Sequence, residues 1–320
     1  MRRLLNLSIR NTIARIRFWQ CIMTTRPSAP VHIETIRDFY SFGLGHTRAI
    51  DVYLPSDYAT SRRRYQVLYA NDGQDMPRLN LAMSLNGLYA RNRMESIIVV
   101  AIHATADRLI EYGTIGTPNA RRQGAKAAAY ARFLLDEVRP YINRRYRTLA
   151  GASAIMGLSL GGLSAFDIAW HHADVFGAVG VFSGAFWWRT DDAGWQARQA
   201  SRIAHQLVRT SQKRSGLRFW FEVGTADETA DRDGNGAIDT IQDTTELIDE
   251  LAAIGYRRDK DMALIEVKGG RHDHVTWAKV LPYFLQWAFP PRRSFLAKLV
   301  MNLRQPSWSK YVDAGGRRFG

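Results

Sequence analysis

Residues 97–102, which read IIVVAI, constrain the fold more than any other segment of this 320-residue sequence. Five of the six side chains are β-branched, which favours a strand, and no polar residue alternates with them. A strand without a polar face is buried on both sides, as central strands of parallel sheets are. The chain is therefore expected to contain a sheet that helices cover on both faces.

Strand-like and helix-like segments alternate along the rest of the chain. Two β-rich runs at the N-terminal side read as a hairpin, and Pro55 ends the second. Strands are expected at 31–42, 47–54, 66–70, 97–102, 154–156, 179–182, 217–223 and 263–267, and helices at 125–144, 162–171, 240–254 and 275–288. This order predicts one α/β domain with a mostly parallel central sheet, helices on both faces and an antiparallel N-terminal edge. Ligands of such a sheet bind at the carboxyl ends of its strands.

The net charge of +14 at pH 7 belongs to the two ends of the chain. Residues 1–30 hold six Arg and no acidic residue, and residues 290–320 hold seven Lys or Arg against one Asp. Residues 31–289 hold 31 basic and 29 acidic residues. We therefore divide the chain into a basic extension, a nearly neutral domain and a basic tail. A neutral domain gives no support to a nucleic-acid-binding face, so no nucleic-acid partner is expected.

Both basic ends are loosely amphipathic, because Leu, Ile and Phe alternate with Arg and Lys in each. One hypothesis is peripheral contact with an anionic membrane surface, and the alternative is an unstructured extension. Arg10 interrupts the first apolar stretch, so no secretory signal is predicted. The single cysteine excludes an internal disulfide. We expect a cytoplasmic protein, with membrane association through the ends as an addition.

Residues 157–161 read GLSLG, with Ser159 at the centre. This pattern is typical of a sharp turn between a strand and a helix that raises a serine hydroxyl above the sheet. Glycines are needed two positions away because larger side chains would collide with the neighbouring backbone. The apolar strand before the turn and the helix after it fit this context, so Ser159 is the predicted nucleophile.

A serine hydroxyl needs a base to accept its proton, and an imidazole has the right proton affinity at neutral pH. His272 lies in a glycine-rich loop between the last predicted strand and the last helix, and His274 is the alternative. The acid that orients the imidazole is expected in the loop after strand 217–223. Asp227 is preferred there, Glu228 is the alternative, and Glu222 lies within the strand.

These residues resemble the esterase D-like or "putative esterase" family of α/β-hydrolases, which includes enterochelin, feruloyl and acetyl xylan esterases. The resemblance covers roughly residues 33–288. It rests on six segments: 48–55, ending in VYLP; 69–74, ending in DGQ; the GLSLG turn; 183–188 (SGAFWW); 224–227 (GTAD); and 269–272 (GGRH) with Trp277. Together these motifs identify the superfamily without selecting a substrate.

The resemblance implies a serine esterase that acts on a small-molecule carboxylic ester and requires no cofactor. By its motifs Ser159, Asp227 and His272 carry over as a catalytic triad. The backbone N–H groups of Leu160 and Gln74 are the expected oxyanion donors. Arg108, Glu111 and Tyr112 match a loop pattern of some relatives, and Trp187 and Trp188 are the aromatic residues of SGAFWW. We expect Arg108, Tyr112, Trp187 and Trp188 near the pocket; the alternative for the tryptophans is core packing.

The loop that follows Asp227 resembles a calcium-binding loop of the EF-hand type. Oxygen-bearing side chains occupy its first, third, fifth and ninth positions and glycine its sixth, but the twelfth is Gln242. The expected ligands of a structural Ca²⁺ are Asp231, Asp233, Asn235, Asp239 and Asp243. The alternative is that Asp239 caps helix 240–254, with Gln242 reaching back as in a capping box.

Two other functions remain open at this stage. An acyltransferase would use the same triad if another alcohol outcompeted water for the acyl group. A non-catalytic binding module could keep the α/β-hydrolase fold alone, because a fold does not fix a function. Esterase activity is preferred, since all three triad positions hold competent residues.

Overall fold

The computed structural model describes residues 30–151, 153–258, 260–291 and 312–313 of the chain. The basic ends predicted from the sequence lie almost entirely outside these residues, so membrane contact through them stays a prediction. Within the described ranges, no helix has the length and apolar character needed to cross a membrane.

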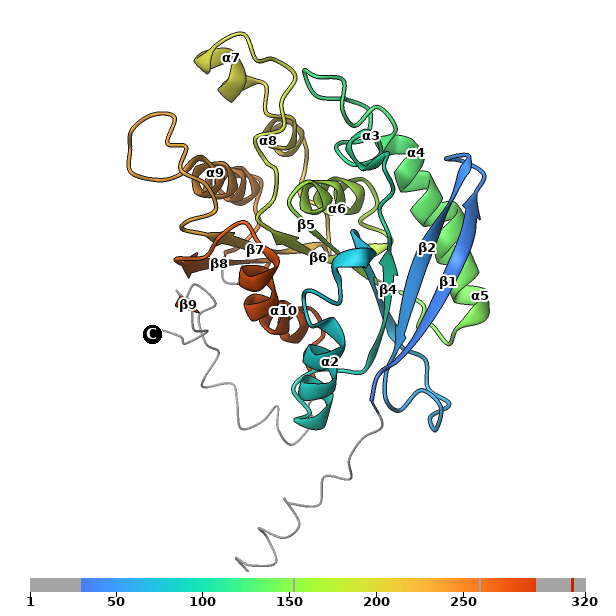
Figure 1. The fold of residues 1–320 in the computed structure, drawn as a ribbon. Helices are drawn as coiled ribbons and strands as arrows, with labels where there is room; N and C mark the ends of the chain where they lie inside the picture. Colours follow the sequence, from blue (N-terminus) through green and yellow to red (C-terminus); the bar gives the residue numbers. More distant parts are fainter. Residues whose placement is uncertain (1–29, 152, 259, 292–311, 314–320) are drawn as a thin grey trace, which may run out of the picture.

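A nine-stranded sheet forms the centre of the described part of the chain, in the order β1-β2-β4-β3-β5-β6-β7-β8-β9 (Figure 1). Its strands are β1 (His32–Ser41), β2 (His46–Leu54), β3 (Gln66–Ala70), β4 (Ile97–Ile102), β5 (Ser153–Leu158), β6 (Phe176–Phe182), β7 (Arg218–Gly224), β8 (Met262–Lys268) and β9 (Val312–Asp313). β2 runs antiparallel to β1 and to β4, and the remaining pairings in these residues are parallel. The predicted α/β architecture with an antiparallel N-terminal edge is confirmed. β9 adds two residues of the predicted basic tail to the edge of β8.

Helices cover both faces of the sheet (Figure 1). They are α2 (Leu81–Ala90), α3 (Arg108–Glu111), α4 (Ala127–Arg132), α5 (Arg139–Arg145), α6 (Leu160–His171), α7 (Trp195–Ala200), α8 (Ile203–Arg209), α9 (Asp239–Ala253) and α10 (His274–Ala288), with a 3₁₀ turn, η1 (Gly73–Asp75), and a π segment, η2 (Phe133–Val138). α2 and α10 pack on one face, and α4, α5, α6, α8 and α9 pack on the other.

The two faces of the sheet bury separate hydrophobic cores. Along β3, Val67 and Tyr69 belong to one core, whereas Leu68 and Ala70 belong to the other. Successive side chains of a strand point to opposite faces, so a strand covered on both sides needs apolar residues throughout. This packing explains why the sequence of 97–102 shows no alternation.

The helix predicted over 125–144 is one helical stretch with a change of pitch, in which η2 separates α4 from α5. Pro140, the second residue of α5, has no N–H to donate, so the backbone hydrogen-bond ladder is interrupted at this point. The wider π turns lie directly before the proline. The spacing of apolar residues in the sequence predicts a helix but does not show a local change from α-helical to π-helical pitch.

Close packing of α10 on β6 depends on Gly180. A Cβ atom at this position would lie 2.5 Å from Cε2 of Phe284, the α10 residue packed against it. Interiors packed this tightly tolerate added atoms poorly. Gly180 therefore sets how near α10, which follows the His272 loop, can approach the sheet.

We expect Gly180→Ala to lower the free energy of unfolding by about 1–3 kcal/mol, because the added methyl group must displace Phe284 or the strand. Gly194→Ala is the matched control, since its extended backbone (φ 170°) has no heavy atom within 4 Å of an added Cβ. Urea unfolding of both variants measures the difference. Equal stability of the two variants would contradict this account of the packing.

Candidate active site

Ser159 occupies a strained turn between β5 and α6. Its φ of 53° and ψ of −121° are unusual for a residue with a side chain, and such conformations cost about 1–3 kcal/mol. Two backbone hydrogen bonds hold the turn: Ser159 N–H donates to the Phe182 carbonyl (2.8 Å), and Ala185 N–H donates to the Ser159 carbonyl (3.2 Å). The end of β6 thereby fixes the serine at the carboxyl edge of the sheet.

The glycines around Ser159 are required by close contacts, with the backbone at Gly157 and with neighbouring side chains at Gly161. A Cβ atom at Gly157 would lie 2.0 Å from the Gly161 carbonyl oxygen. At Gly161 it would lie 2.5 Å from Oδ2 of Asp72, which belongs to a different loop. The steric reason given for the GLSLG pattern therefore holds, and the turn is also pressed against the segment that contains Asp72.

His272 and Asp227 face each other at the carboxyl ends of β8 and β7. His272 Nδ1 lies 3.5 Å from Asp227 Oδ2; the Asp227 side chain has no exposed surface, and that of His272 is 40% exposed. Among the described residues, neither Asp227 carboxylate oxygen receives a hydrogen bond. A buried carboxylate in this position can orient the imidazole ring. Two further hydrogen bonds, Thr225 N–H to the Val267 carbonyl and Ala226 N–H to the Gly270 carbonyl, tie the two loops together.

The alternative base and acid have other partners. His274 is the first residue of α10, and its Nε2 lies 3.2 Å from Oδ1 of Asp75 in η1. Glu228 Oε1 accepts a hydrogen bond from Thr240 N–H (2.6 Å) and so caps the start of α9. Of the candidate bases and acids named from the sequence, His272 and Asp227 are the two that face each other.

The end of β6 connects the histidine to the serine turn. The indole Nε1–H of Trp277, in α10, donates to Ser183 Oγ (2.9 Å), and Ser183 directly follows Phe182, the backbone partner of Ser159. The imidazole of His272 lies edge-on to the same indole, with 5.1 Å between the ring centroids. The serine, imidazole and acid loops thus meet at one edge of the sheet.

The predicted oxyanion donors lie at two adjacent helix starts. Leu160 is the first residue of α6, and Gln74 belongs to η1; the first N–H groups of a helix have no acceptor within it. Asn71 Nδ2 donates to the Gly161 carbonyl (2.8 Å), which joins the loop before η1 to the first turn of α6. Ala104 N–H donates to Gln74 Oε1 (2.9 Å) and holds the Gln74 side chain aside.

Arg108 and Tyr112, predicted near the pocket, fix the loop before Gln74. Arg108 donates from Nε and Nη2 to the two carboxylate oxygens of Asp72 (2.7 and 2.8 Å), and the Arg108 side chain is 29% exposed. Its Nη2 also lies 3.5 Å from the Leu158 carbonyl, beside Ser159. Asp72 N–H donates to the Tyr112 hydroxyl (3.1 Å), and Tyr112 is buried. Both side chains therefore hold Asp72 next to the serine turn, and Arg108 alone has exposed surface.

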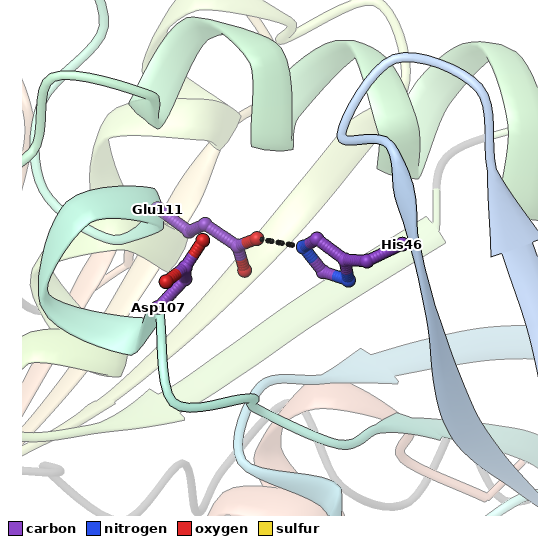
Figure 2. Close-up of side chains that lie close together, drawn as sticks. All are labelled: His46, Asp107 and Glu111. Atoms are coloured by element: carbon purple, nitrogen blue, oxygen red, sulfur yellow. Dashed lines mark hydrogen bonds and ion pairs between the residues drawn. The ribbon is translucent and has the colours of Figure 1, made fainter.

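The sequence did not reveal the cluster that anchors α3. Figure 2 shows the Glu111 carboxylate directed at the His46 imidazole (2.6 Å), with Asp107 beside it. Ligand atoms of these three residues lie within 4.8 Å of one another, as in a metal site. However, Arg48 Nη2 donates to both Glu111 oxygens (2.9 and 2.8 Å), and Lys126 pairs with Asp107 (3.1 Å). The cluster is therefore an ion-pair network that binds α3 to β2.

The two tryptophans predicted as pocket walls differ in exposure. Trp188 is 1% exposed, and its ring lies 3.1 and 3.3 Å from added Cβ atoms at Gly113 and Gly124, so it supports the 113–124 loop from the core. Trp187 is 40% exposed. The core-packing alternative describes Trp188, and Trp187 is the one that has surface to offer a ligand.

The predicted calcium ligands do not converge as a set. Asp231 accepts hydrogen bonds from the N–H groups of residues 234, 235 and 236, and Asp233 accepts one from Asn235 N–H. Asp239 accepts one from Arg232 N–H. Asp243 is buried and pairs with Arg202 (2.5 Å) and Arg232 (2.8 Å), which corrects its assignment as a ligand, since two guanidinium groups already neutralise it.

The capping-box alternative for this segment is wrong. Thr240 N–H is capped by Glu228, and Gln242 Nε2 donates to Asp233 Oδ2 (2.8 Å). Within the described residues, the three-residue cluster of potential metal-binding atoms lies at His46, Asp107 and Glu111 and not in this loop.

Glu222, set aside as a strand residue, is a buried carboxyl group beneath the Asp227 loop. Its side chain is buried, and its Oε2 lies 3.5 Å from Ser183 Oγ. Burial, and secondly the negative charge of Asp227, raise the pKa of Glu222 well above its ordinary value. The raised pKa keeps this carboxyl group protonated to a higher pH than an exposed glutamate.

Because the pKa of Glu222 is higher in the folded chain than in the unfolded one, its contribution to stability is complete below the unfolded value and is lost as the pH rises. We expect the wild type to lose stability relative to Glu222→Gln from about pH 4.5 upward, by as much as about 1.4 kcal/mol per pH unit. Urea unfolding at pH 5, 6, 7 and 8 measures the difference, and a value independent of pH would contradict a neutral Glu222.

Comparison with known proteins gives one family match. The family model described as "Putative esterase" matches residues 41–287, a range that includes Ser159, Asp227 and His272. The protein YbbA of Bacillus subtilis is 21% identical over 255 residues, which cover 78% of this chain and 95% of YbbA.

Solved structures of esterases share the fold. The ferulic acid esterase AmCE1/Fae1A of Anaeromyces mucronatus aligns with a TM-score of 0.60 at 18% identity and covers 85% of this chain and 95% of that one. The enterobactin esterase FES of Shigella flexneri aligns with a TM-score of 0.62 at 19% identity and covers 82% of this chain and 60% of that one. At these identities the likeness shows the α/β-hydrolase fold. With the family match over most of its length, the chain belongs to the "Putative esterase" family.

Proposed function

We propose that this protein is a serine esterase that hydrolyses a small-molecule carboxylic ester through an acyl-enzyme intermediate. Ser159 is the nucleophile, His272 the base, and Asp227 the acid that orients the imidazole. The observation that carries the proposal is the buried Asp227 carboxylate, 3.5 Å from His272 Nδ1, at the sheet edge where a strained turn presents Ser159. The family match supports ester hydrolysis in general.

In the first step, Ser159 Oγ attacks the ester carbonyl while His272 Nε2 takes the hydroxyl proton. The imidazole gains a positive charge in this step. Asp227 stabilises that charge more strongly than an exposed acid could, because its carboxylate is buried and water screens the interaction little. Its position at Nδ1 leaves Nε2 free for the serine.

The tetrahedral intermediate places a negative charge on the former carbonyl oxygen. The backbone N–H groups of Leu160 and Gln74 are the proposed donors, and the start of α6 adds the positive end of its dipole. Arg108 and Tyr112 act on this step indirectly, since they hold Asp72, the residue before Gly73-Gln74. His272 then protonates the leaving alcohol, and the acyl group stays on Ser159.

To complete the reaction, His272 removes a proton from a water molecule, whose oxygen attacks the acyl carbonyl. The bond from the acyl carbon to Ser159 Oγ then breaks, the imidazolium returns the proton to Oγ, and the carboxylic acid leaves. An alcohol that enters in place of water would accept the acyl group, so acyl transfer remains the second candidate activity. FES and AmCE1/Fae1A are named for enterobactin and ferulic acid, which makes aryl-containing esters a reasonable first substrate panel. Trp187, which is 40% exposed and lies two residues after Ala185, the hydrogen-bond partner of Ser159, is the proposed contact for an aromatic group.

Steady-state kinetics with p-nitrophenyl esters compare the two neighbouring histidines. We expect His272→Gln to lower kcat by roughly 10³-fold or more, because no other imidazole faces Asp227, and Asp227→Asn to lower it by roughly 10²- to 10⁴-fold. His274→Gln is the matched control and should cost less than about tenfold. A larger loss from His274→Gln than from His272→Gln would contradict the assignment of the base.

In the same experiment, the identity of the acyl product distinguishes ester hydrolysis from acyl transfer. A burst of p-nitrophenol before the steady state indicates an acyl-enzyme. Free acid as the only product in the presence of glycerol or sugars supports the esterase proposal. New esters of the added alcohol as the main product would replace it with the acyltransferase alternative.

Structural calcium stays a prediction of the sequence, reduced to Asp231, Asp233, Asn235 and Asp239 because Asp243 is paired with two arginines. If this loop binds Ca²⁺, the melting temperature should rise in millimolar CaCl₂ relative to EDTA, since binding to the folded state alone adds stability. Asp233→Asn should abolish the rise. If the melting temperature of the wild type does not rise in CaCl₂, the loop does not bind Ca²⁺, and the triad proposal is unchanged.

A further inference from the structure

Glu222 lies at one end of a series of polar contacts that runs through Ser183 to Trp277 and has no part in the proposed mechanism. We call this series the polar path. The Glu222 carboxyl group is buried within β7, and among the described residues its Oε1 atom has no hydrogen-bond partner. Buried polar groups are rarely left in this way without a role. The Oε2 atom faces Ser183 at the carboxyl end of β6 (3.5 Å), so the acid is directed toward the active-site edge of the sheet.

Ser183 links Glu222 to Trp277. Its backbone adopts a left-handed conformation (φ 46°), and its N–H donates to the Glu222 carbonyl (2.8 Å), which fixes the hydroxyl between the two side chains. The Trp277 indole N–H donates to Ser183 Oγ (2.9 Å). An indole can only donate, so the single hydroxyl proton of Ser183 is available for Glu222.

Trp277 in turn defines where the imidazole of His272 can lie. The two rings meet edge to face, with 5.1 Å between centroids and 78° between planes. The same indole contacts His274 at 5.4 Å, so it separates the proposed base from its neighbour. A shift of the indole would move His272 relative to the buried Asp227 carboxylate.

We propose that Glu222 is a positioning residue for His272 and acts through the hydroxyl of Ser183 and the indole of Trp277. The inference rests on the proposed function, because it assumes that His272 is the base. Glu222 touches neither substrate nor the reacting atoms in this account. Its effect is to keep the imidazole in line with both Asp227 and the serine.

The charge of Glu222 also affects the surroundings of His272. Burial, and secondly Asp227, raise the pKa of Glu222; the other charged group that acts on it is Asp273, at the start of α10. The raised pKa favours a neutral Glu222, which leaves Asp227 as the carboxylate that pairs with His272.

The test compares three variants by kcat per active site titrated with a fluorophosphonate, so that unfolded protein does not count. Glu222→Gln keeps a carbonyl acceptor and no charge, and we expect kcat within about threefold of the wild type and an unchanged acidic limb of the kcat/KM profile. Glu222→Leu and Trp277→Phe break the path, and we expect kcat to fall by about tenfold or more at unchanged KM. Trp277→Phe keeps an aromatic ring, so it remains informative if Glu222→Leu does not fold.

Trp170→Phe is the matched control, because this buried tryptophan also loses an indole N–H but lies outside the path. It should keep kcat within about twofold. Wild-type kcat in Trp277→Phe, or a loss in Glu222→Gln as large as in Glu222→Leu, would overturn the inference. A lower midpoint of the acidic limb in Glu222→Gln would also overturn it, since it would show an ionised Glu222. Full activity of Ser159→Ala would instead refute the proposed function itself.

Discussion

The strained backbone at Ser159 is the constraint on which the rest of the site depends. A residue with φ 53° and ψ −121° is stable only where its surroundings hold it, and here the end of β6 does so through hydrogen bonds on both sides of the serine. A Cβ atom would collide with the backbone of α6 at Gly157 and with the Asp72 side chain at Gly161. Sheet and helix packing therefore supply the free energy that keeps the backbone of Ser159 in this conformation.

The acidic residues around this turn each pair with a different group. Asp72 is neutralised by Arg108 and supports the loop of Gln74, whereas Asp227 is buried and left to the imidazole. Glu111, anchored by Arg48 and His46, fixes α3 and so the position of Arg108. Glu222 faces Ser183, the acceptor of the Trp277 indole, and we propose that it positions His272 through these two side chains.

Local signals made the α/β fold predictable and pointed to the three residues proposed as the triad. The apolar strands, the GLSLG turn and the GGRH loop are each encoded within a few residues, and β1 to β8, α6, α9 and α10 lie close to their predicted ranges. The sequence analysis did not predict α2, α7, α8 or β9. Contacts between distant residues were not predictable: Arg108 and Asp72 are 36 residues apart, and Arg48 and Glu111 are 63 apart. Trp187 and Trp188 are adjacent yet differ in exposure, because a loop far along the chain covers one of them.

The most direct test of the account is reaction with a fluorophosphonate probe, followed by peptide mapping. A serine activated by His272 should be labelled at position 159 alone, at a rate that rises as the imidazole loses its proton, and Ser159→Ala should not be labelled. Folded protein that shows no labelling would point to a binding module with this fold. Labelling at another residue, with ester hydrolysis unchanged in Ser159→Ala, would contradict the proposed chemistry.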